Sequence, residues 1–507
     1  MIRFDLATLA KAAQGKLVCH ESLSALNVDN LVTDSRAIQS EDNPQENLPE
    51  KQQTAFLALK GPNFDGHRFA TQVIEKGCQV LIVDHQIANI DNSTVAQIVV
   101  DDTRIALGKI AAYVKQQVAP KTVGITGSSG KTTVKEMLAA ILARLGKVLA
   151  TNGNFNNDIG VPLTLLRLEQ EHDFAVIEMG ANHIGEIAYT TALVKPDVAM
   201  INNIAAAHLE GFGDLCGVAR AKGEIFSGLP ENGVALYNKD TKYTNKWQWR
   251  LTDKKVRTFS CLNPVNADCY SSDVVLDSDG CASFKLQSSL GQCEIKLTVP
   301  GKHNVCNAVA AVSAAIECGA TLNDIQLGLA QMAPVQGRLN IHHLTASKVS
   351  NKIKLVDDTY NANVESIKAA ITLLANYSGQ SILILGDMAE LGSDARSYHQ
   401  EVGEYAKEQG INVLLTLGVL SQNTSDAFAK ENDAISEHFV DKQALNDYLF
   451  NLLVSKRFEE QRLNSESINM LVKGSRSAHM DYVVKDIISW HCDVCEKHQS
   501  QTTEGNA

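Results

Sequence analysis

The chain of 507 residues has no apolar run approaching the roughly 18 residues that a membrane-spanning helix needs. Its start, Met1-Ile2-Arg3-Phe4-Asp5, lacks the apolar core of a secretory signal, so the sequence predicts a cytoplasmic protein without a membrane span. There is also no excess of positive charge: the chain has 46 Lys and Arg and 58 Asp and Glu, which gives a net charge of −12. Phosphate backbones select basic surfaces, so we expect no nucleic acid as the main partner, although a nucleotide needs only a local basic cluster.

Regular cysteine spacing is absent as well. The 11 cysteines are scattered along the chain, and together with the start of the sequence this indicates reduced thiols. The pair Cys492 and Cys495 has histidines beside it, at His491 and His498, and such a set could bind Zn²⁺. Because no second pair completes a structural zinc site, we favour an incidental arrangement.

A chain of this length exceeds one hydrophobic core, and about three domains are expected. Short apolar runs alternate with helical stretches in the central part, and four further apolar runs separated by helices follow a hinge at residues 332–338. The sequence therefore predicts an α/β protein with a small α/β front domain, a central P-loop domain with a mostly parallel sheet, and a C-terminal Rossmann-like, doubly wound domain. The expected ranges are 1–105, 106–334 and 335–507, with a disordered polar tail from about residue 495.

The most informative motif is Thr-Val-Gly-Ile-Thr-Gly-Ser-Ser-Gly-Lys-Thr-Thr at residues 122–133. An apolar run breaks into a glycine-rich turn, and the spacing after Lys131 is that of an amphipathic helix. In such loops backbone N–H groups converge on phosphate oxygens, the lysine lies near the β and γ phosphates, and a threonine hydroxyl can ligate Mg²⁺. The general pattern has glycine where this chain has Ile125, so the loop is a variant. The predicted nucleotide-binding residues are Gly127, Ser128, Ser129, Gly130, Lys131, Thr132 and Thr133.

Several polar residues come just after apolar runs, where open α/β sheets bind their ligands. Glu178 directly follows the run 174–177 and could hold Mg²⁺ beside the P-loop, or merely cap the next turn. His208 follows the run 198–204, although a lone histidine is more often structural. Lys222, taken alone, predicts an ordinary ion pair on a helix surface.

The third part of the chain carries a polar segment, Asp357-Asp358-Thr359-Tyr360-Asn361-Ala362-Asn363. It suits contacts to a sugar or polyol, and it also reads as an Asx-rich turn that caps a helix at residues 365–374. Arg338 lies at the hinge, where it could reach a transferring phosphoryl group. Lys473 and Arg476 offer two cations for an anionic substrate.

Taken together, the motifs resemble those of the Mur ligase family, ATP-dependent amide ligases of bacterial cell-wall synthesis. The family's P-loop has the form Thr-Gly-x-x-Gly-Lys-Thr, which accounts for the variant glycine spacing. Residues 151–157, 357–363 and 385–392 most resemble the branch that adds D-alanyl-D-alanine, and the Asp-Asn-Pro-Arg motif of the branch that adds meso-diaminopimelate is absent from the third part. Further matching segments are 34–36, 64–67, 178–180, 203–208, 221–225, 301–308 and 337–338.

The resemblance implies a monomeric ligase of peptidoglycan synthesis, with roles in cell shape and division. The front domain would hold UDP-N-acetylmuramoyl-tripeptide, the central one ATP, and the third D-alanyl-D-alanine. ATP would phosphorylate the tripeptide carboxylate, and the dipeptide amine would attack the acyl phosphate as the third domain rotates to close the site. For the nucleotide, the resemblance implies Lys131 and Arg338 at the γ-phosphate, Asn307 at adenine and Asp357 at the ribose. It implies one Mg²⁺ at Thr132 and Glu178, a second at His208, and a carbamate on Lys222. The implied substrate contacts are Ser35, Arg36, Asn157, Asn361 and Lys473.

Two alternative protein classes remain to be weighed from the sequence. A folylpolyglutamate synthase shares the P-loop variant, but it would not need the roughly 100 residues that precede the P-loop here. A P-loop NTPase that switches a binding partner would not need a second α/β domain with a sugar-friendly Asp/Asn loop. Dependence of ATP turnover on both organic substrates separates these classes.

Overall fold

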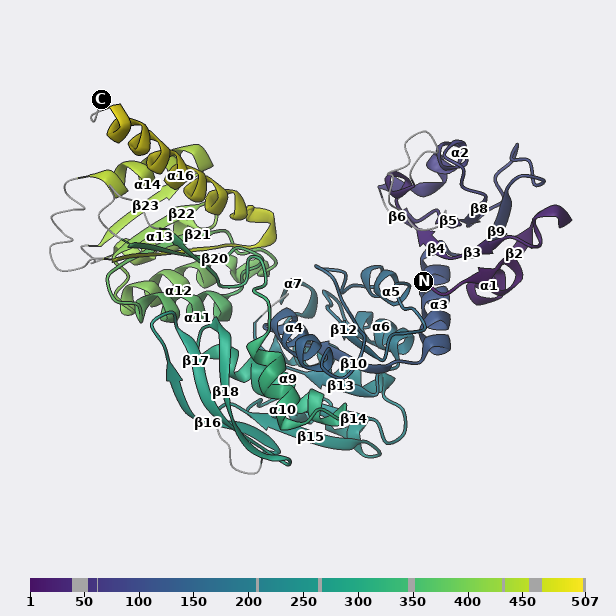
Figure 1. Ribbon diagram of the computed structural model, residues 1–507, viewed down its shortest axis with the longest axis horizontal. Coiled ribbons are helices and arrows are strands. Elements are labelled where there is room, and N and C mark those ends of the chain that lie inside the picture. The colour runs from purple at the N-terminus through teal and green to yellow at the C-terminus, as the bar shows by residue number, and fades with distance from the viewer. Residues whose placement is uncertain are drawn as a thin grey trace.

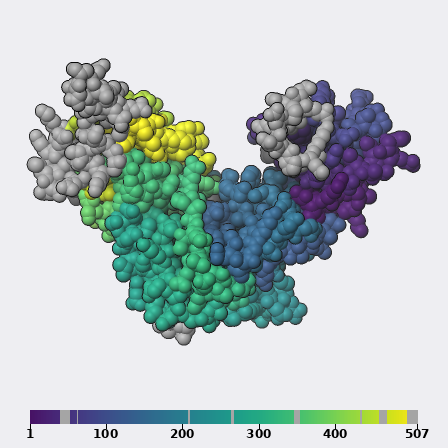
Figure 2. Space-filling view, in the orientation of Figure 1, coloured from purple at the N-terminus to yellow at the C-terminus, as the bar shows by residue number. Residues whose placement is uncertain are grey.

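The computed structural model describes residues 1–38, 53–61, 63–206, 209–262, 267–344, 352–430, 434–455 and 467–504, with side chains described as far as Cys492. Three larger β-sheets follow one another along the chain. Figure 1 shows them as three bodies: a purple front body, a blue-to-green central body, and a green-to-yellow C-terminal body. The front and C-terminal bodies stand apart above the central one, with open space between them in Figure 2. The α/β fold class predicted from the sequence is confirmed.

The front sheet has five strands in the order β2-β9-β8-β5-β4. Only β2 is antiparallel to its neighbour, so the carboxyl ends of the other four strands meet at one edge. Side chains alternate along β8: Leu81 and Val83 pack toward α2, whereas Val80 and Ile82 pack toward α1 and α3. The elements are α1 (Leu6–Ala13), β2 (Lys16–Val18), β4 (Asn30–Val32), β5 (Thr54–Leu57), α2 (Ala70–Glu75), β8 (Val80–Val83), β9 (Ala96–Val99) and α3 (Thr103–Val118).

Helix α3 joins the front body to the central body. Asp102 caps its start by accepting hydrogen bonds from the N–H groups of Arg104 and Ile105, at 2.8 and 3.0 Å. The buried face of the helix packs against α1 and also against α5 (Gly160–Leu165) and α6 (Glu186–Val194). The predicted boundary after residue 105 falls inside this helix, so the division into 1–105 and 106–334 stays a prediction.

The central sheet has nine strands in the order β11-β12-β10-β13-β14-β15-β16-β17-β18. Pairing is parallel from β11 to β16 and antiparallel from β16 to β18. Helices α4, α9 and α10 cover one face, and α5, α6 and α8 cover the other. Bounds not yet given are β10 (Lys121–Thr126), α4 (Lys131–Leu142), β11 (Val148–Ala150), β12 (Phe174–Glu178), β13 (Val198–Ile201), α7 (Leu209–Phe212), α8 (Leu215–Gly223), β14 (Val234–Asn238), β15 (Lys255–Ser260), β16 (Cys269–Leu276), β17 (Cys281–Ser288), β18 (Gly291–Pro300), α9 (His303–Glu317) and α10 (Leu322–Ala330).

The C-terminal sheet has six strands in the order β19-β20-β24-β21-β22-β23, parallel except for β19. Along β21, Leu383 and Leu385 face α11, α12 and α13, while Ile382 and Ile384 face α14 and α16. The bounds are β19 (Asn340–Leu344), β20 (Lys352–Asp358), α11 (Val364–Ala375), β21 (Gln380–Gly386), α12 (Ala395–Glu408), β22 (Val413–Leu417), α13 (Gln422–Ala429), β23 (Ile435–Phe439), α14 (Lys442–Val454), β24 (Ser467–Lys473) and α16 (Asp481–Glu504).

Helix α16 is described as far as Glu504, and the disordered tail expected from about residue 495 stays a prediction. The expectation that the cysteines are reduced thiols is wrong for one pair. Cys261 and Cys306 form a disulfide with Cα atoms 5.4 Å apart, because the end of β15 and the start of α9 bring together cysteines that are 45 residues apart in sequence. Cys492 is a free, exposed thiol, whereas the side chain of Cys495 lies outside the described residues.

Within the parts of the chain that the structure describes, we find no helix with the length and apolar character needed to cross a bilayer.

Candidate active site

The phosphate loop connects β10, the third of the nine strands of the central sheet, to α4. Gly130 closes the loop with φ of +73°, a conformation that favours glycine. A Cβ added at Gly130 would lie only 2.3 Å from Asn307 Oδ1 and 2.7 Å from Asn202 Nδ2. Both the backbone conformation and the lack of space therefore require glycine at this position.

Asparagine side chains hold the loop in place. The N–H groups of Ser128 and Ser129 donate to Asn203, to its carbonyl oxygen at 3.1 Å and its Oδ1 at 2.9 Å. Asn202 Nδ2 donates to Ser129 O at 3.0 Å and to Asn307 Oδ1 at 3.1 Å, and Asn307 Nδ2 donates to Asn304 Oδ1 at 2.8 Å. Asn307, predicted at the adenine, thus also connects the P-loop to helix α9.

The first turn of α4 meets the end of β12. The Thr132 hydroxyl donates to Glu178 Oε2 at 3.0 Å, and Asn156 Nδ2 donates to Glu178 Oε1 at 2.8 Å. Glu178 is buried, and among the described residues no lysine or arginine forms an ion pair with it. A buried carboxylate beside a hydroxyl presents the oxygen ligands that Mg²⁺ prefers, so these residues fit the predicted magnesium.

Partly exposed Lys131 lies near this carboxylate, and buried Lys222 lies near Lys131. Lys131 Nζ donates to Gly127 O at 2.9 Å; burial lowers the pKa of Lys131, the Glu178 carboxylate counteracts this only in part, and Arg338 adds to the lowering. Burial, helped by the charge of Lys131, holds the pKa of Lys222 well below its ordinary value. The surface ion pair that Lys222 alone predicts is wrong, because its side chain is buried 5.8 Å above the Phe212 ring and no described carboxylate pairs with it.

Arg338 spans the two bodies that form the site. Its Nη2 donates to Thr132 Oγ1 at 3.0 Å, across 206 positions of sequence. Its guanidinium stacks over the Tyr360 ring at 4.3 Å from the centroid. A planar guanidinium held on an aromatic face is oriented for anionic oxygens.

The polar segment at the end of β20 caps a helix, one of the two roles that the sequence allowed, and its contact with a sugar or polyol stays a prediction. Asn363 caps α11 by accepting from the Ser366 N–H at 2.9 Å, and the helix runs over Val364–Ala375. Asp357 is buried, with its Oδ1 accepting from the N–H and hydroxyl of Thr359 at 3.1 and 2.6 Å. Asp358 is the carboxylate of this pair that lines the cleft.

Lys473 and Arg476, the two cations predicted near the end of β24, differ in burial and in ion pairing. Lys473 is buried, and its ammonium contacts Asp358 Oδ2 at 2.6 Å and Asn361 O at 2.8 Å. Its charge is therefore already compensated inside the protein. Arg476 is exposed and lines the cleft, which makes it the cation open to an anionic substrate.

A cleft of about 1060 Å³ connects these groups between the central and C-terminal bodies. Ser35 and Arg36 are not among its lining residues: they lie in the front body, where exposed Arg36 pairs with Asp34 at 2.7 Å. Lys222 and Asp357 are buried and are not among the residues that line the cleft. His208 lies outside the described residues. The predicted residues that line the cleft are Ser128, Ser129, Gly130, Lys131, Thr132, Thr133, Asn157, Glu178, Asn307, Arg338, Asn361 and Lys473.

Sequence reasoning missed Asn202, the Asn156 contact to Glu178, and the stacking of Tyr360 under Arg338. Asn202 directly follows the buried strand β13, and that position just past a strand end was the available signal. No local signal existed for Tyr360, whose partner lies in the hinge.

Comparison with known proteins agrees with this geometry. Three family models match: "Mur ligase family, catalytic domain" at residues 51–115, "Mur ligase middle domain" at 125–315, and "Mur ligase, glutamate ligase domain" at 337–457. The UDP-N-acetylmuramoyl-tripeptide--D-alanyl-D-alanine ligase of Escherichia coli K12 is 48% identical over 430 residues, which cover 85% of this chain and 90% of that protein. The chain belongs to the Mur ligase family.

Solved Mur ligase structures have the same architecture. A crystal structure of MurF from Acinetobacter baumannii superposes with a TM-score of 0.84 at 36% identity, over 96% of this chain and 99% of that one. MurF ligase from Thermotoga maritima, solved in complex with ADP, matches with a TM-score of 0.74 at 24% identity, over 92% and 98% of the two chains. This Mur ligase therefore has the three-part architecture that the resemblance implied.

Proposed function

We propose that this Mur ligase joins D-alanyl-D-alanine to UDP-N-acetylmuramoyl-tripeptide, with conversion of ATP to ADP and phosphate. The observation that carries the proposal is the cleft in which the P-loop, the Thr132–Glu178 pair and Arg338 meet a polar loop of the C-terminal sheet. The names of relatives such as the Escherichia coli ligase supply the substrates. The product is the pentapeptide precursor of peptidoglycan.

The three parts of the chain have separate roles in this proposal. Residues 1–105 hold the uridine nucleotide, with Ser35 and Arg36 at the carboxyl edge of the front sheet. Residues 106–334 bind ATP, and residues 335–507 bind the incoming dipeptide near Asn361 and Arg476. Asn157 lies on the central side of the cleft, where the tripeptide carboxylate would meet the γ-phosphate.

The chemistry requires two anions to meet, because a carboxylate oxygen attacks a phosphoryl group. Backbone N–H groups of the P-loop, Lys131 and Arg338 provide positive charge around the γ-phosphoryl group. Transfer gives an acyl phosphate and ADP; the dipeptide amine then attacks the acyl carbon, and phosphate leaves as the amide forms. Mg²⁺, held by Thr132 and Glu178, would supply further charge neutralisation, with a second ion assigned to His208.

Lys222 is proposed to carry a carbamate. A neutral amine adds to CO₂ and loses a proton, which turns a buried cation into a metal-binding anion. The lowered pKa of Lys222 favours the neutral amine that this reaction needs, and the missing ion-pair partner among the described residues leaves the lysine free to react.

¹³C NMR in ¹³C-bicarbonate tests the carbamate. We expect one carbamate signal in the wild type, its loss in Lys222→Ala, and its retention in Lys473→Ala, where the removed lysine is also buried but paired with Asp358. A signal that persists in Lys222→Ala would place the modification elsewhere.

The activity is tested by phosphate release from ATP and Mg²⁺, with the two organic substrates added singly and together. We expect release only with both, and a product mass equal to the tripeptide nucleotide plus the dipeptide less one water. Release with neither substrate would indicate a switch-type NTPase, and turnover only with a folate and glutamate would indicate the other ligase branch. Glu178→Gln should lower the rate by about 100-fold or more, whereas the same change at exposed Glu169 should not.

We further place this reaction in the cytoplasm and assign the active form as a monomer. Light scattering at assay concentrations tests the second point, and a mass of twice 55.0 kDa would contradict it.

A further inference from the structure

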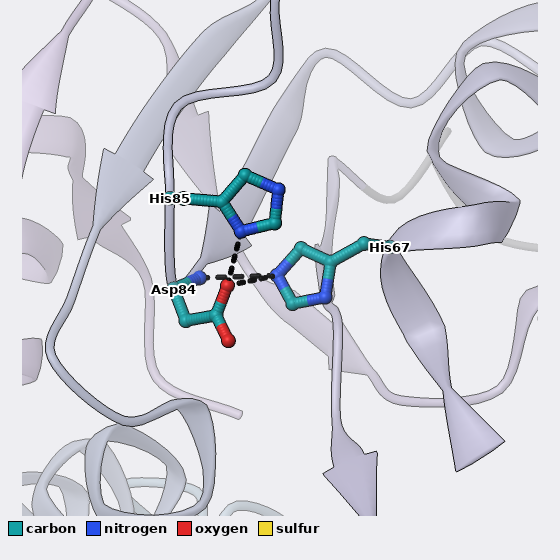
Figure 3. A group of neighbouring side chains, drawn as sticks. All are labelled: His67, Asp84 and His85. Carbon is teal, nitrogen blue, oxygen red and sulfur yellow. Dashed lines mark hydrogen bonds and ion pairs between the residues drawn. The ribbon is translucent and has the colours of Figure 1, made fainter.

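A group of metal-ligating side chains lies in the front body, away from the cleft. His67 belongs to the short 3₁₀ turn η3 (Gly66–Phe69), and Asp84 and His85 directly follow strand β8. One ligand atom from each of the three residues lies within 4.8 Å of the others. Figure 3 shows ring nitrogens of both histidines pointing at the same carboxylate oxygen of Asp84.

His67 is held through both of its ring nitrogens. Its Nδ1 lies 2.6 Å from Asp65 Oδ1, and its Nε2 lies 3.1 Å from the backbone nitrogen of Asp84. A carboxylate that accepts from the far nitrogen is the usual support of a histidine that ligates a metal through the other nitrogen.

The same Nε2 lies 3.1 Å from Asp84 Oδ1, and His85 Nδ1 contacts that oxygen too. Either a proton on the ring or a metal ion can join such nitrogens to the carboxylate oxygen. Lys60 does not fill this place, because its ammonium lies 3.5 Å from the other oxygen, Oδ2. The convergent atoms thus form a site for a cation.

Two of the three side chains are mostly buried, and the third is exposed. The side chain of His67 is 7% exposed and that of Asp84 20%, whereas His85 is 64% exposed. The two imidazole rings stack with centroids 4.8 Å apart and planes 24° apart. Two ligands are therefore preset, and the third can adjust its rotamer to complete the coordination.

We propose that His67 Nε2, the Asp84 carboxylate and His85 Nδ1 bind a divalent transition-metal ion of the zinc type, with the remaining position open to water. Two imidazoles and one carboxylate form a ligand set that suits Zn²⁺, Co²⁺ or Ni²⁺. Mg²⁺ prefers oxygen ligands throughout, so the metal of this site is distinct from that of the cleft. The ion ties the end of β8 to η3, at the carboxyl edge of the front sheet.

The test uses the full chain with excess Mg²⁺ and ADP present, so that the cleft is occupied, and Zn²⁺ is the probe. Equilibrium dialysis with metal analysis measures the zinc bound, and Co²⁺ substitution reports tetrahedral coordination through its visible absorption. We expect one zinc per chain in the wild type and affinity about tenfold weaker or worse in His85→Ala and in Asp84→Asn. His343→Ala is the matched control, since it removes a histidine of similar exposure with a single carboxylate neighbour, Asp279 at 3.5 Å; its zinc affinity should equal that of the wild type.

Two results would overturn the proposal. One is equal zinc affinity in the wild type, His85→Ala and Asp84→Asn. The other is no zinc bound by a wild type whose thermal melting shows it folded, because a second proton on His67 would then provide the cation. Since His85 is exposed, His85→Ala is expected to fold, and its melting curve verifies this.

Discussion

Replacing Gly130 by alanine tests the phosphate loop most directly. The added Cβ would meet Asn307 Oδ1 at 2.3 Å and Asn202 Nδ2 at 2.7 Å, so the amide contact between these two side chains must break. Holding alanine at φ of +73° costs about 1 to 2 kcal/mol. Leaving buried amide groups unpaired adds about 1 to 3 kcal/mol.

Gly410 provides the matched control. Its φ is +72°, and nothing lies within 4 Å of an added Cβ, so Gly410→Ala has the conformational cost without the collision. Both variants should melt earlier than the wild type. Only Gly130→Ala should also weaken ADP binding, by about 10- to 100-fold, since about 1.4 kcal/mol corresponds to a factor of ten.

Isothermal titration with ADP and Mg²⁺ measures the affinity, and calorimetric melting checks the fold. Wild-type ADP affinity in a folded Gly130→Ala variant would refute the reasoning, because the loop would then not need the close approach of Asn307. Equal weakening in both glycine variants would also contradict it, since the effect would come from general destabilisation.

Three further predictions concern other contacts. Arg338→Lys keeps the charge but loses the guanidinium that stacks on Tyr360 and reaches Thr132, so kcat should fall by about 10- to 100-fold in the phosphate-release assay; an unchanged kcat would remove Arg338 from the phosphoryl contacts. Burial raises the pKa of Glu317, but hydrogen bonds from Lys255 and Arg257 outweigh it and hold the pKa below the ordinary 4.5, so stability present above pH 4.5 is lost as pH falls through the lowered value. Glu317→Gln should flatten that acid loss in denaturant titrations, and an unchanged profile would count against the ion pairs. Finally, thiol titration of the unfolded chain should rise by two groups after reduction, and Cys261→Ser should abolish this rise; no rise in the wild type would mean that Cys261 and Cys306 are thiols.

Much of the site could be predicted because its signals are local in sequence. The turn between β10 and α4 needs its glycines within a few residues of Lys131 and Thr132, so one short motif carries the nucleotide chemistry. The alternation of apolar runs and helices likewise predicted parallel sheets, since buried strands are short and apolar and their crossovers are helical. Glu178 could be placed at the site because parallel strands present their carboxyl ends at one edge.

Other features depend on contacts between distant segments. Arg338 and Thr132 are separated by 206 positions, Asn202 and Asn307 by 105, and Lys473 and Asp358 by 115, and no local pattern relates such pairs. The burial of Lys222 reversed the prediction of a surface ion pair, because a helix sequence does not reveal what packs over its end. His67 lies in a different segment from Asp84 and His85, and the three become a candidate metal site only where β8 ends beside η3.

The sequence by itself therefore determined the α/β class, the phosphate loop and the family, since each depends on residues close together in the chain. The tertiary structure decided which charges are paired, which lysine is buried without a described partner, and which side chains meet across the hinge. The physical reason is that electrostatic and hydrogen-bond energies depend on distances and burial, and these are set only when separate segments pack together.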